Sequence, residues 1–180
     1  MYVPTHFDEP RIEVLHDLIR QHPFGILFTH GASGLDANHI PFELDPQRGG
    51  MGVLNAHVAR ANPVWKDVSD GDEVLVVFRV ADAYVSPNWY PSKHEFHKQV
   101  PTWNYMVAHA YGRIAIRDDE RFVRSVVARL TRTHEASQPA PWSGPRRPCA
   151  NEAASTTCSS RRPLRRWRCC SSRHGRFSTV

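Results

Sequence analysis

Short apolar segments follow one another closely through most of this chain, and turn-forming residues separate them. The segments at 24–29, 51–57 and 73–80 are rich in Val, Leu, Ile and Phe, while Gly, Asp, Asn and Pro stand between them. Strands at this spacing favour a small barrel, closed or half-closed, over a parallel sheet. The 180 residues are enough for one ordinary domain with a real core.

The predicted strands cover 24–29, 35–44, 51–57, 73–80 and 104–116, and 82–86 continues the fourth around a bend. His30 to Gly34 predicts a tight turn, Pro41 marks an edge or a bulge, and Gly112 suggests a second bulge. A helix ending near Gln21 precedes the strands, and a helix capped by Asp118 follows them. The predicted fold class is therefore mainly β, of the α+β kind, with peripheral helices.

Charge divides the chain at about residue 142. Residues 1–142 carry 14 Lys and Arg against 17 Asp and Glu, whereas residues 143–180 carry nine Arg and one acid, Glu152. We predict a folded domain over 1–142, incomplete at its C-terminal end, and a separate Arg/Ser/Cys-rich tail over 143–180. The tail is interpreted as disordered or frameshift-derived, with an Arg-rich nucleic-acid arm as a third interpretation. Residues 1–142, called the body, are slightly acidic and so lack the excess of basic residues that is typical of a nucleic-acid-binding domain.

Composition also excludes several classes of protein. All four Cys lie in the tail, so the body is not a disulfide scaffold. The longest apolar run, Val74 to Phe78, is too short to span a bilayer, and no signal peptide is recognisable. These features predict a soluble cytoplasmic protein. No nucleophile motif, Walker-type loop or H-E-x-x-H motif is present, so no catalytic residue is assigned, and any chemistry must come from a cofactor.

The segment from His57 to Lys66 is the strongest candidate for ligand binding. A strand that ends in a short helix presents backbone N–H groups to a phosphate, and Arg60 and Lys66 add charge. Asn62 either caps the turn or donates to a ligand, and Trp65 offers a ring face. The alternative interpretation is a solvated helix face beside an ordinary turn.

A second polar and aromatic group follows at 84–90 and 100–105. Thr102 and Asn104 offer hydrogen-bond donors, while Trp103 and Tyr105 present rings on the same side of a strand. Trp89 and Tyr90 shield a ligand ring or close a dimer interface. The alternative is a structural aromatic cluster at the barrel lip. His94 and His97, three residues apart, lack further ligands, so no metal site is predicted.

These segments, together with His39-Ile40-Pro41-Phe42, resemble the PaiB family of FMN-binding split-barrel proteins, described as negative transcriptional regulators. The resemblance covers Met1 to about Trp142 and implies a Greek-key split barrel that binds FMN. It implies a homodimer anchored by Trp89, Tyr90 and Trp103, with DNA as a possible partner of a regulator. An FMN- and NAD(P)H-dependent oxidoreductase and a damaged product remain alternatives. The implied cofactor-binding residues are His39, His57, Arg60, Asn62, Trp65, Lys66, Trp89, Tyr90, Thr102, Trp103, Asn104 and Tyr105.

Overall fold

The computed structural model describes residues 3–93, 99–142 and 168–179, the last range as backbone only. Seven strands form one sheet: β1 (Phe24–Gly31), β2 (Gly34–Pro41), β3 (Glu43–Asp45), β4 (Val53–Val58), β5 (Glu73–Val85), β6 (Thr102–Arg117) and β7 (Arg168–Thr179). The helices are α1 (Ile12–Gln21), α2 (Val64–Asp67) and α4 (Glu120–Glu135), with single 3-10 turns η1 (Thr5–Phe7) and η2 (Pro87–Trp89). The prediction of a mainly β fold is confirmed.

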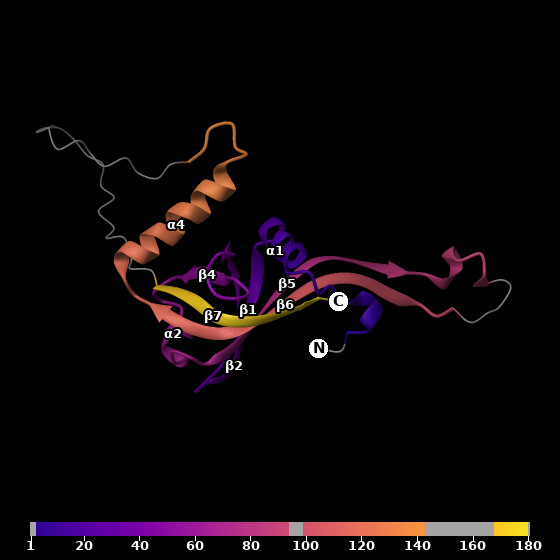
Figure 1. Cartoon of the computed structure of the whole chain (residues 1–180), viewed down its shortest axis with the longest axis horizontal. Coiled ribbons are helices and arrows are strands. Elements are labelled where there is room, and N and C mark those ends of the chain that lie inside the picture. The colour runs from indigo at the N-terminus through magenta and orange to yellow at the C-terminus, as the bar shows by residue number, and fades with distance from the viewer. Residues whose placement is uncertain (1–2, 94–98, 143–167, 180) are drawn as a thin grey trace, which may run out of the picture.

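The sheet is antiparallel throughout, with the strand order β2-β1-β5-β6-β7-β4-β3. It curls around a single main core, with α1 against one side of the strands and α4 beside β4 and β7 (Figure 1). The β1–β2 turn is tighter than the predicted His30 to Gly34, because β1 continues to Gly31 and β2 already begins at Gly34, which takes a φ of 99° that favours glycine.

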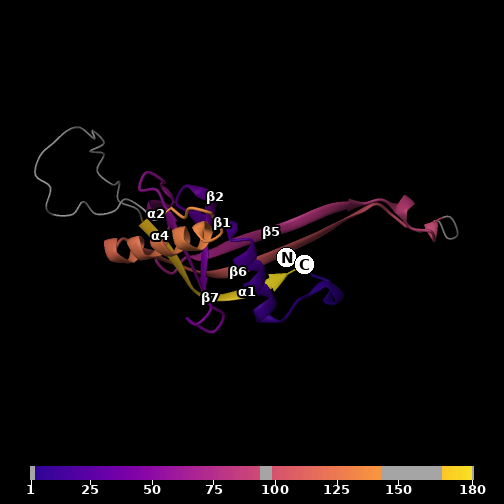
Figure 2. The same ribbon diagram turned by 90° about the horizontal axis from the view of Figure 1, so that it is seen from above.

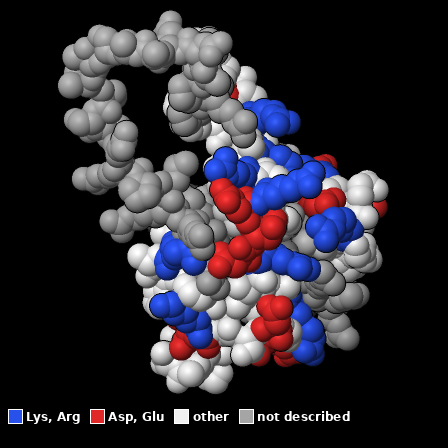
Figure 3. All heavy atoms as spheres, turned by 90° about the vertical axis from the view of Figure 1, so that its left-hand side faces the viewer, with Lys and Arg blue, Asp and Glu red and all other residues white. Residues whose placement is uncertain are grey.

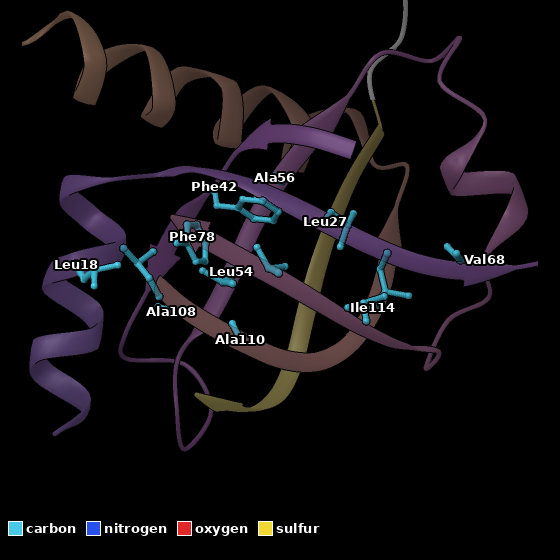
Figure 4. Packing of buried hydrophobic residues seen from close by; sticks show 13 residues of the cluster. Leu18, Leu27, Phe42, Leu54, Ala56, Val68, Phe78, Ala108, Ala110 and Ile114 are labelled. Carbon is cyan, nitrogen blue, oxygen red and sulfur yellow. The ribbon is translucent and has the colours of Figure 1, made fainter. Parts of the chain in front are cut away.

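The core lies inside the curled sheet, where Phe78 is fully buried and its ring meets that of Phe42 edge to face, with 5.6 Å between centroids. Figure 4 shows these rings among side chains from β1, β4, β5 and β6, with Leu18 of α1 approaching from the side. Gly25 permits this packing, because a Cβ there would lie 2.9 Å from the Phe78 ring. The buried face of α1, with Leu18 and Ile19, therefore contributes directly to the core.

Strand alternation gives the sheet two distinct faces. Leu27, Val76 and Ala110 are neighbours across β1, β5 and β6, and all three point into the core. The next row, Ile26, Val77 and His109, points the other way and is only half-buried. The outward side of these three strands is thus apolar without being part of the core.

Strands β5 and β6 continue beyond the body of the sheet as a two-stranded ribbon. A register shift between Arg79 and Ala81 marks its base, and the ribbon projects away from the other strands in both views (Figures 1 and 2). We call its described residues, 81–90 and 99–106, the arm. The sequence predicted a bend over 82–86 and a loop after it; instead, β5 runs straight on to Val85, because its backbone pairs with β6 as far as Thr102.

One further strand differs from the sequence prediction, and one predicted irregularity is seen. The predicted second strand is divided into β2 and β3 at Phe42, whose side chain enters the core. The register of the β6–β7 pair shifts between Tyr111 and Arg113, so Gly112 lies at the expected irregularity. The division at Phe42 arises because a buried side chain decides the local geometry.

The tail is only partly described. Residues 143–167 and 180 lie outside the described residues, but the backbone of β7 pairs with β4 on one side and β6 on the other. The interpretation of 143–180 as a disordered or frameshift-derived tail stays a prediction. Ladder hydrogen bonds use the backbone, so a strand can fill the place between β4 and β6 without an apolar periodicity.

The helix α4 begins one residue later than predicted. Asp119, not Asp118, is its N-cap, and its Oδ1 accepts a hydrogen bond of 2.7 Å from the backbone N–H of Phe122. The helix has an apolar stripe, because Val123, Val126 and Leu130 are buried together. Asp118 is directed instead toward Arg60, 58 residues earlier in the chain. This contact could not be foreseen from local sequence.

We expect Asp119→Ala to lower the free energy of unfolding by about 1 kcal/mol, because it leaves the Phe122 N–H without its capping oxygen. Urea denaturation followed by circular dichroism measures the difference. Asp119→Asn keeps a capping oxygen and should retain most of the stability. Equal losses in the two variants would show that charge, not capping, is the contribution of this residue.

Candidate functional site

The predicted ligand corner, residues 57–66, follows the end of β4 and leads into α2. The indole Nε1 of Trp65 donates to the carbonyl oxygen of Arg60 at 3.2 Å, which closes the segment into a compact loop. The backbone N–H of Asn62 donates to the carbonyl oxygen of Ala59 at 2.8 Å. The corner is therefore held in one shape by its own hydrogen bonds, a favourable property for a binding site.

The backbone donors expected at this corner are largely in use. Asn62 Oδ1 accepts from the N–H of Val64 at 2.9 Å, and the N–H groups of Lys66 and Asp67 donate to the carbonyl oxygen of Pro63. Helix α2 has only four residues, so its dipole is small. The idea of a phosphate held by free N–H groups and a helix dipole is thus not supported, and an anion here would depend on side chains.

Two cations supply that charge. Lys66 is exposed, and its Nζ lies over the indole ring of Trp65, 5.0 Å from the ring centroid. Arg60 Nη2 lies 2.8 Å from Asp118 Oδ1, with both side chains about one third exposed. Part of the Arg60 charge is therefore already balanced, so Lys66 is the stronger candidate for neutralising an added anion.

Asn62 also links the corner to β2, because its Nδ2 donates to Oδ1 of Asn38 at 2.6 Å. The sequence did not indicate Asn38 as a site residue, although an amide at an inward position of β2 was the available signal. His39 is the next residue along the strand, so its side chain lies on the opposite face and is exposed. The structure does not bring His39 into the corner.

His57 lies near the end of β4, half-buried, and burial lowers the pKa of its imidazole from the usual value near 6.5. The neutral ring is thus favoured in the folded protein at neutral pH. It can accept or donate one hydrogen bond, but it adds no positive charge to the corner. The cationic part of the corner consists of Arg60 and Lys66.

The second predicted group lies on the arm. Trp103 pairs with Tyr84 across the two strands, with 5.8 Å between ring centroids, and Tyr105 occupies the same side of β6. Thr102 and Asn104 point to the other side of the ribbon. Trp89 and Tyr90, in and after η2, are exposed. As predicted, the rings of Trp103 and Tyr105 lie on the same side of β6.

Within one chain the two predicted groups are separated. Figures 1 and 2 show α2 at one end of the molecule and the arm extending from the other end. One copy therefore does not bring the arm residues onto the corner. His94 and His97 lie outside the described residues, and among those described no group of three or more side chains is placed to hold a metal ion.

The amino-acid sequence of this chain is similar to those of known proteins. Residues 1–154 match the family described as "Putative FMN-binding domain". The chain belongs to this family. An uncharacterized protein of Saccharomyces cerevisiae, YKL070W, is 35% identical in an alignment of 159 positions that covers 77% of this chain and 93% of that protein. The protease synthase and sporulation protein PAI 2 of Bacillus subtilis is 27% identical over 130 residues, 72% of this chain and 60% of that protein. The resemblance to PaiB is confirmed.

Solved structures show the same fold at low sequence identity. The flavocytochrome Anf3 from Azotobacter vinelandii matches with a TM-score of 0.64 and 12% identity, covering 99% of this chain and 71% of that chain. The FAD and heme binding protein from Mycobacterium smegmatis matches with a TM-score of 0.58 and 18% identity, covering 96% and 71%. The chain thus has the split-barrel architecture that was predicted, and its membership of the FMN-binding domain family supports FMN as its cofactor. No helix in the described part of the chain is long and apolar enough to cross a membrane.

The lowered pKa of His57 predicts a pH dependence of stability. The unfolded chain takes up a proton near pH 6.5, while the folded protein resists protonation at this site, so stability should fall as the pH drops below about 6.5. We expect His57→Gln to lose less stability between pH 7.5 and 5.5 than the wild type, as measured by thermal melting. His134→Gln, on the exposed side of α4, is the matched control. An unchanged pH slope in His57→Gln would contradict the prediction.

Proposed function

We propose that this chain binds FMN at the corner formed by residues 57–66 and uses the flavin as a sensed ligand in a regulatory role of the PaiB type. One observation carries the proposal: Lys66 is exposed and lies over the ring of Trp65, whose Nε1 donates to the carbonyl oxygen of Arg60, in a chain of the family described as "Putative FMN-binding domain". A phosphate dianion needs a fixed cation and room in solvent, and Lys66 offers both. The residues present fit that group.

In this proposal Lys66 and Arg60 hold the FMN phosphate, and the rings of the arm cover the flavin. When bound, FMN supplies a ring system that accepts and releases electrons. The chain's own part is to bind and orient it: Trp65 fixes Lys66, and Asp118 positions the guanidinium of Arg60. The protein would act in the cytoplasm as a homodimer.

DNA is the partner that a regulatory role would suggest. On the face seen in Figure 3, acidic and basic side chains alternate, which does not favour a continuous basic surface there. Ion pairs of this kind join Arg124 to Glu120 and Arg129 to Glu43. A regulator built this way would depend on a few specific contacts more than on bulk charge.

A flavin-dependent oxidoreductase is the second candidate. It is favoured by the likeness to a flavocytochrome, which has a TM-score above 0.6. In this alternative FMN would pass electrons from NADH or NADPH to a small acceptor. The described residues suggest no nucleophile for it, so catalysis would rest on the flavin and its orientation.

One experiment separates these functions. The full chain is loaded with FMN and the absorbance at 340 nm is followed with NADH and with NADPH, in air and with added quinone. The regulatory proposal predicts saturable FMN binding with no turnover above that of free FMN. Sustained oxidation of NADH or NADPH would favour the oxidoreductase, and absence of FMN binding would contradict both.

A further inference from the structure

The β1–β2 hairpin contacts the ligand corner and its neighbour at two separate points. At the first, Nδ2 of Asn62 donates to Oδ1 of Asn38 on β2. At the second, the turn that joins β1 to β2 contacts Asp67, the last residue of α2, which directly follows the corner. Figures 1 and 2 both show α2 beside this hairpin. The hairpin is therefore the part of the sheet that contacts α2, and the second contact lies next to Lys66.

The contact with Asp67 uses both the backbone and a side chain of the turn. Oγ of Ser33 donates to Oδ1 of Asp67 at 2.7 Å, and the backbone N–H of Ser33 donates to the same oxygen at 3.1 Å. The backbone N–H of Ala32 donates to the carbonyl oxygen of Asp67 at 3.3 Å. Hydrogen bonds to an ionised carboxylate are stronger than those between neutral groups. The direction of the Asp67 carboxylate is therefore fixed by the turn.

Gly31 makes room for this contact. A Cβ at Gly31 would collide with both the carbonyl oxygen and the carboxylate of Asp67. Gly31 is not one of the glycines with a positive φ, so space and not backbone conformation favours glycine at this position. The turn thus accommodates Asp67 through its small residue as well as through its donors.

Helix α2 does not need the charge of Asp67 for its own stability. Its position is held by Val64 and Val68, which are 1% and 5% exposed. A carboxylate at the C-terminal end of a helix lies at the negative end of the helix dipole, where it is unfavourable. The contact with Ser33 therefore has its main consequence in where the negative charge of Asp67 points.

That direction matters because Lys66 is the residue before Asp67. Successive residues of a helix do not face each other, and in the described part of the chain no ion pair joins these two. Arg60 is already paired with Asp118 at 2.8 Å, which leaves Lys66 as the cation for an added anion. A carboxylate of Asp67 that turned toward Lys66 would cancel this charge and repel a phosphate.

We propose that Ser33 and Asp67 form a latch that sets the selectivity of the corner for a phosphorylated ligand. Ser33 holds the carboxylate of Asp67 against the β1–β2 turn, so the negative charge beside Lys66 points away from the bound anion. Ser33 and Asp67 are positioning residues that act through Lys66. The inference rests on the proposed function, because the anion in question is the phosphate of FMN.

Fluorescence titration of the full chain with FMN and with riboflavin tests the latch. Ser33→Ala should weaken FMN binding about three- to fivefold, because the released carboxylate of Asp67 then opposes the phosphate across partly screened solvent. Riboflavin carries no phosphate, so its affinity should change less than about 1.5-fold. Asp67→Asn removes the charge and should raise FMN affinity up to about twofold.

The double variant, Ser33→Ala with Asp67→Asn, is the decisive measurement. It should bind FMN as well as Asp67→Asn alone, because no charge remains for Ser33 to direct. A merely structural contact would not give this result, since loss of the serine would then weaken binding of both flavins in either background. The interaction between the two substitutions is therefore specific to the latch.

Two further variants serve as controls. Ser33→Thr keeps the hydroxyl donor and should retain FMN affinity within about 1.5-fold. Asp45→Asn also neutralises a carboxylate that accepts a turn N–H, that of Gln47 at 3.2 Å, but Asp45 pairs with Val53 at the opposite end of β4 from the corner. It should leave the affinity for FMN unchanged. Circular dichroism checks that every variant is folded.

The outcomes separate failure of the latch from failure of the proposed function. Suppose that the wild type prefers FMN to riboflavin, and that Ser33→Ala weakens both flavins equally or weakens FMN equally with and without Asp67→Asn. Flavin binding at the corner then stands and the latch is overturned. A wild type without saturable FMN binding would contradict the proposed function and the latch together.

Discussion

Replacing Lys66 by alanine is expected to weaken FMN binding about tenfold to thirtyfold, or about 1.4–2 kcal/mol, while riboflavin affinity changes less than about twofold. Only FMN carries the phosphate dianion, and Lys66 is the cation at the corner that is exposed and fixed over an indole ring. Fluorescence titration of both ligands against wild type and variant gives the four affinities. The ratio of FMN to riboflavin affinity is the informative quantity, because it cancels losses that affect the flavin ring.

Two further variants sharpen this prediction. Lys66→Arg keeps the charge and should retain most of the FMN preference, whereas Asp118→Asn should strengthen FMN binding modestly by releasing the balanced charge of Arg60. Equal losses of FMN and riboflavin in Lys66→Ala would place the phosphate elsewhere. A loss in Lys66→Arg as large as in Lys66→Ala would show that shape at this position matters more than charge.

Replacing Phe78 by alanine is expected to lower the free energy of unfolding by about 3–5 kcal/mol. The side chain is fully buried, its ring meets Phe42, and Gly25 leaves no side chain that could move into the space. The lost burial and the remaining cavity both add to the cost. For a domain of this size such a change is a large share of total stability.

Urea denaturation measures this loss, and Trp142→Ala is the matched control. Trp142 is a large aromatic residue that is 60% exposed, so its removal should change stability by less than about 0.5 kcal/mol. Phe78→Leu should lose less than Phe78→Ala, because it fills part of the cavity. A loss below about 1 kcal/mol in Phe78→Ala would contradict the position of the core.

Much of the fold followed from local pattern, and the exceptions have a common cause. The run from Glu73 to Val80 is short, apolar and rich in valine, so its strand was predictable, whereas its continuation to Val85 depends on pairing with β6. Strand β7 has no apolar period and exists through backbone pairing with two neighbours. A sequence pattern indicates which face of a helix or strand is buried. It gives little information about a strand that forms only because its backbone pairs with neighbouring strands.

The candidate site shows the same limit. Trp65, Lys66 and Arg60 are neighbours in sequence, and their grouping was predictable from one segment. The contacts that position them were not, because Asn62 meets Asn38 across 24 residues and Arg60 meets Asp118 across 58. The side of β2 that His39 takes depends on the same register. The separation of arm from corner is a property of the whole fold and had no local signal.

The most direct test of the central claim is a titration of the purified full chain with FMN and with riboflavin under identical conditions. The account predicts saturable binding of FMN with quenched flavin fluorescence and an affinity at least tenfold higher than that of riboflavin, the difference arising from the phosphate at Lys66 and Arg60. Equal affinities for the two flavins, or no saturable binding of FMN, would contradict it.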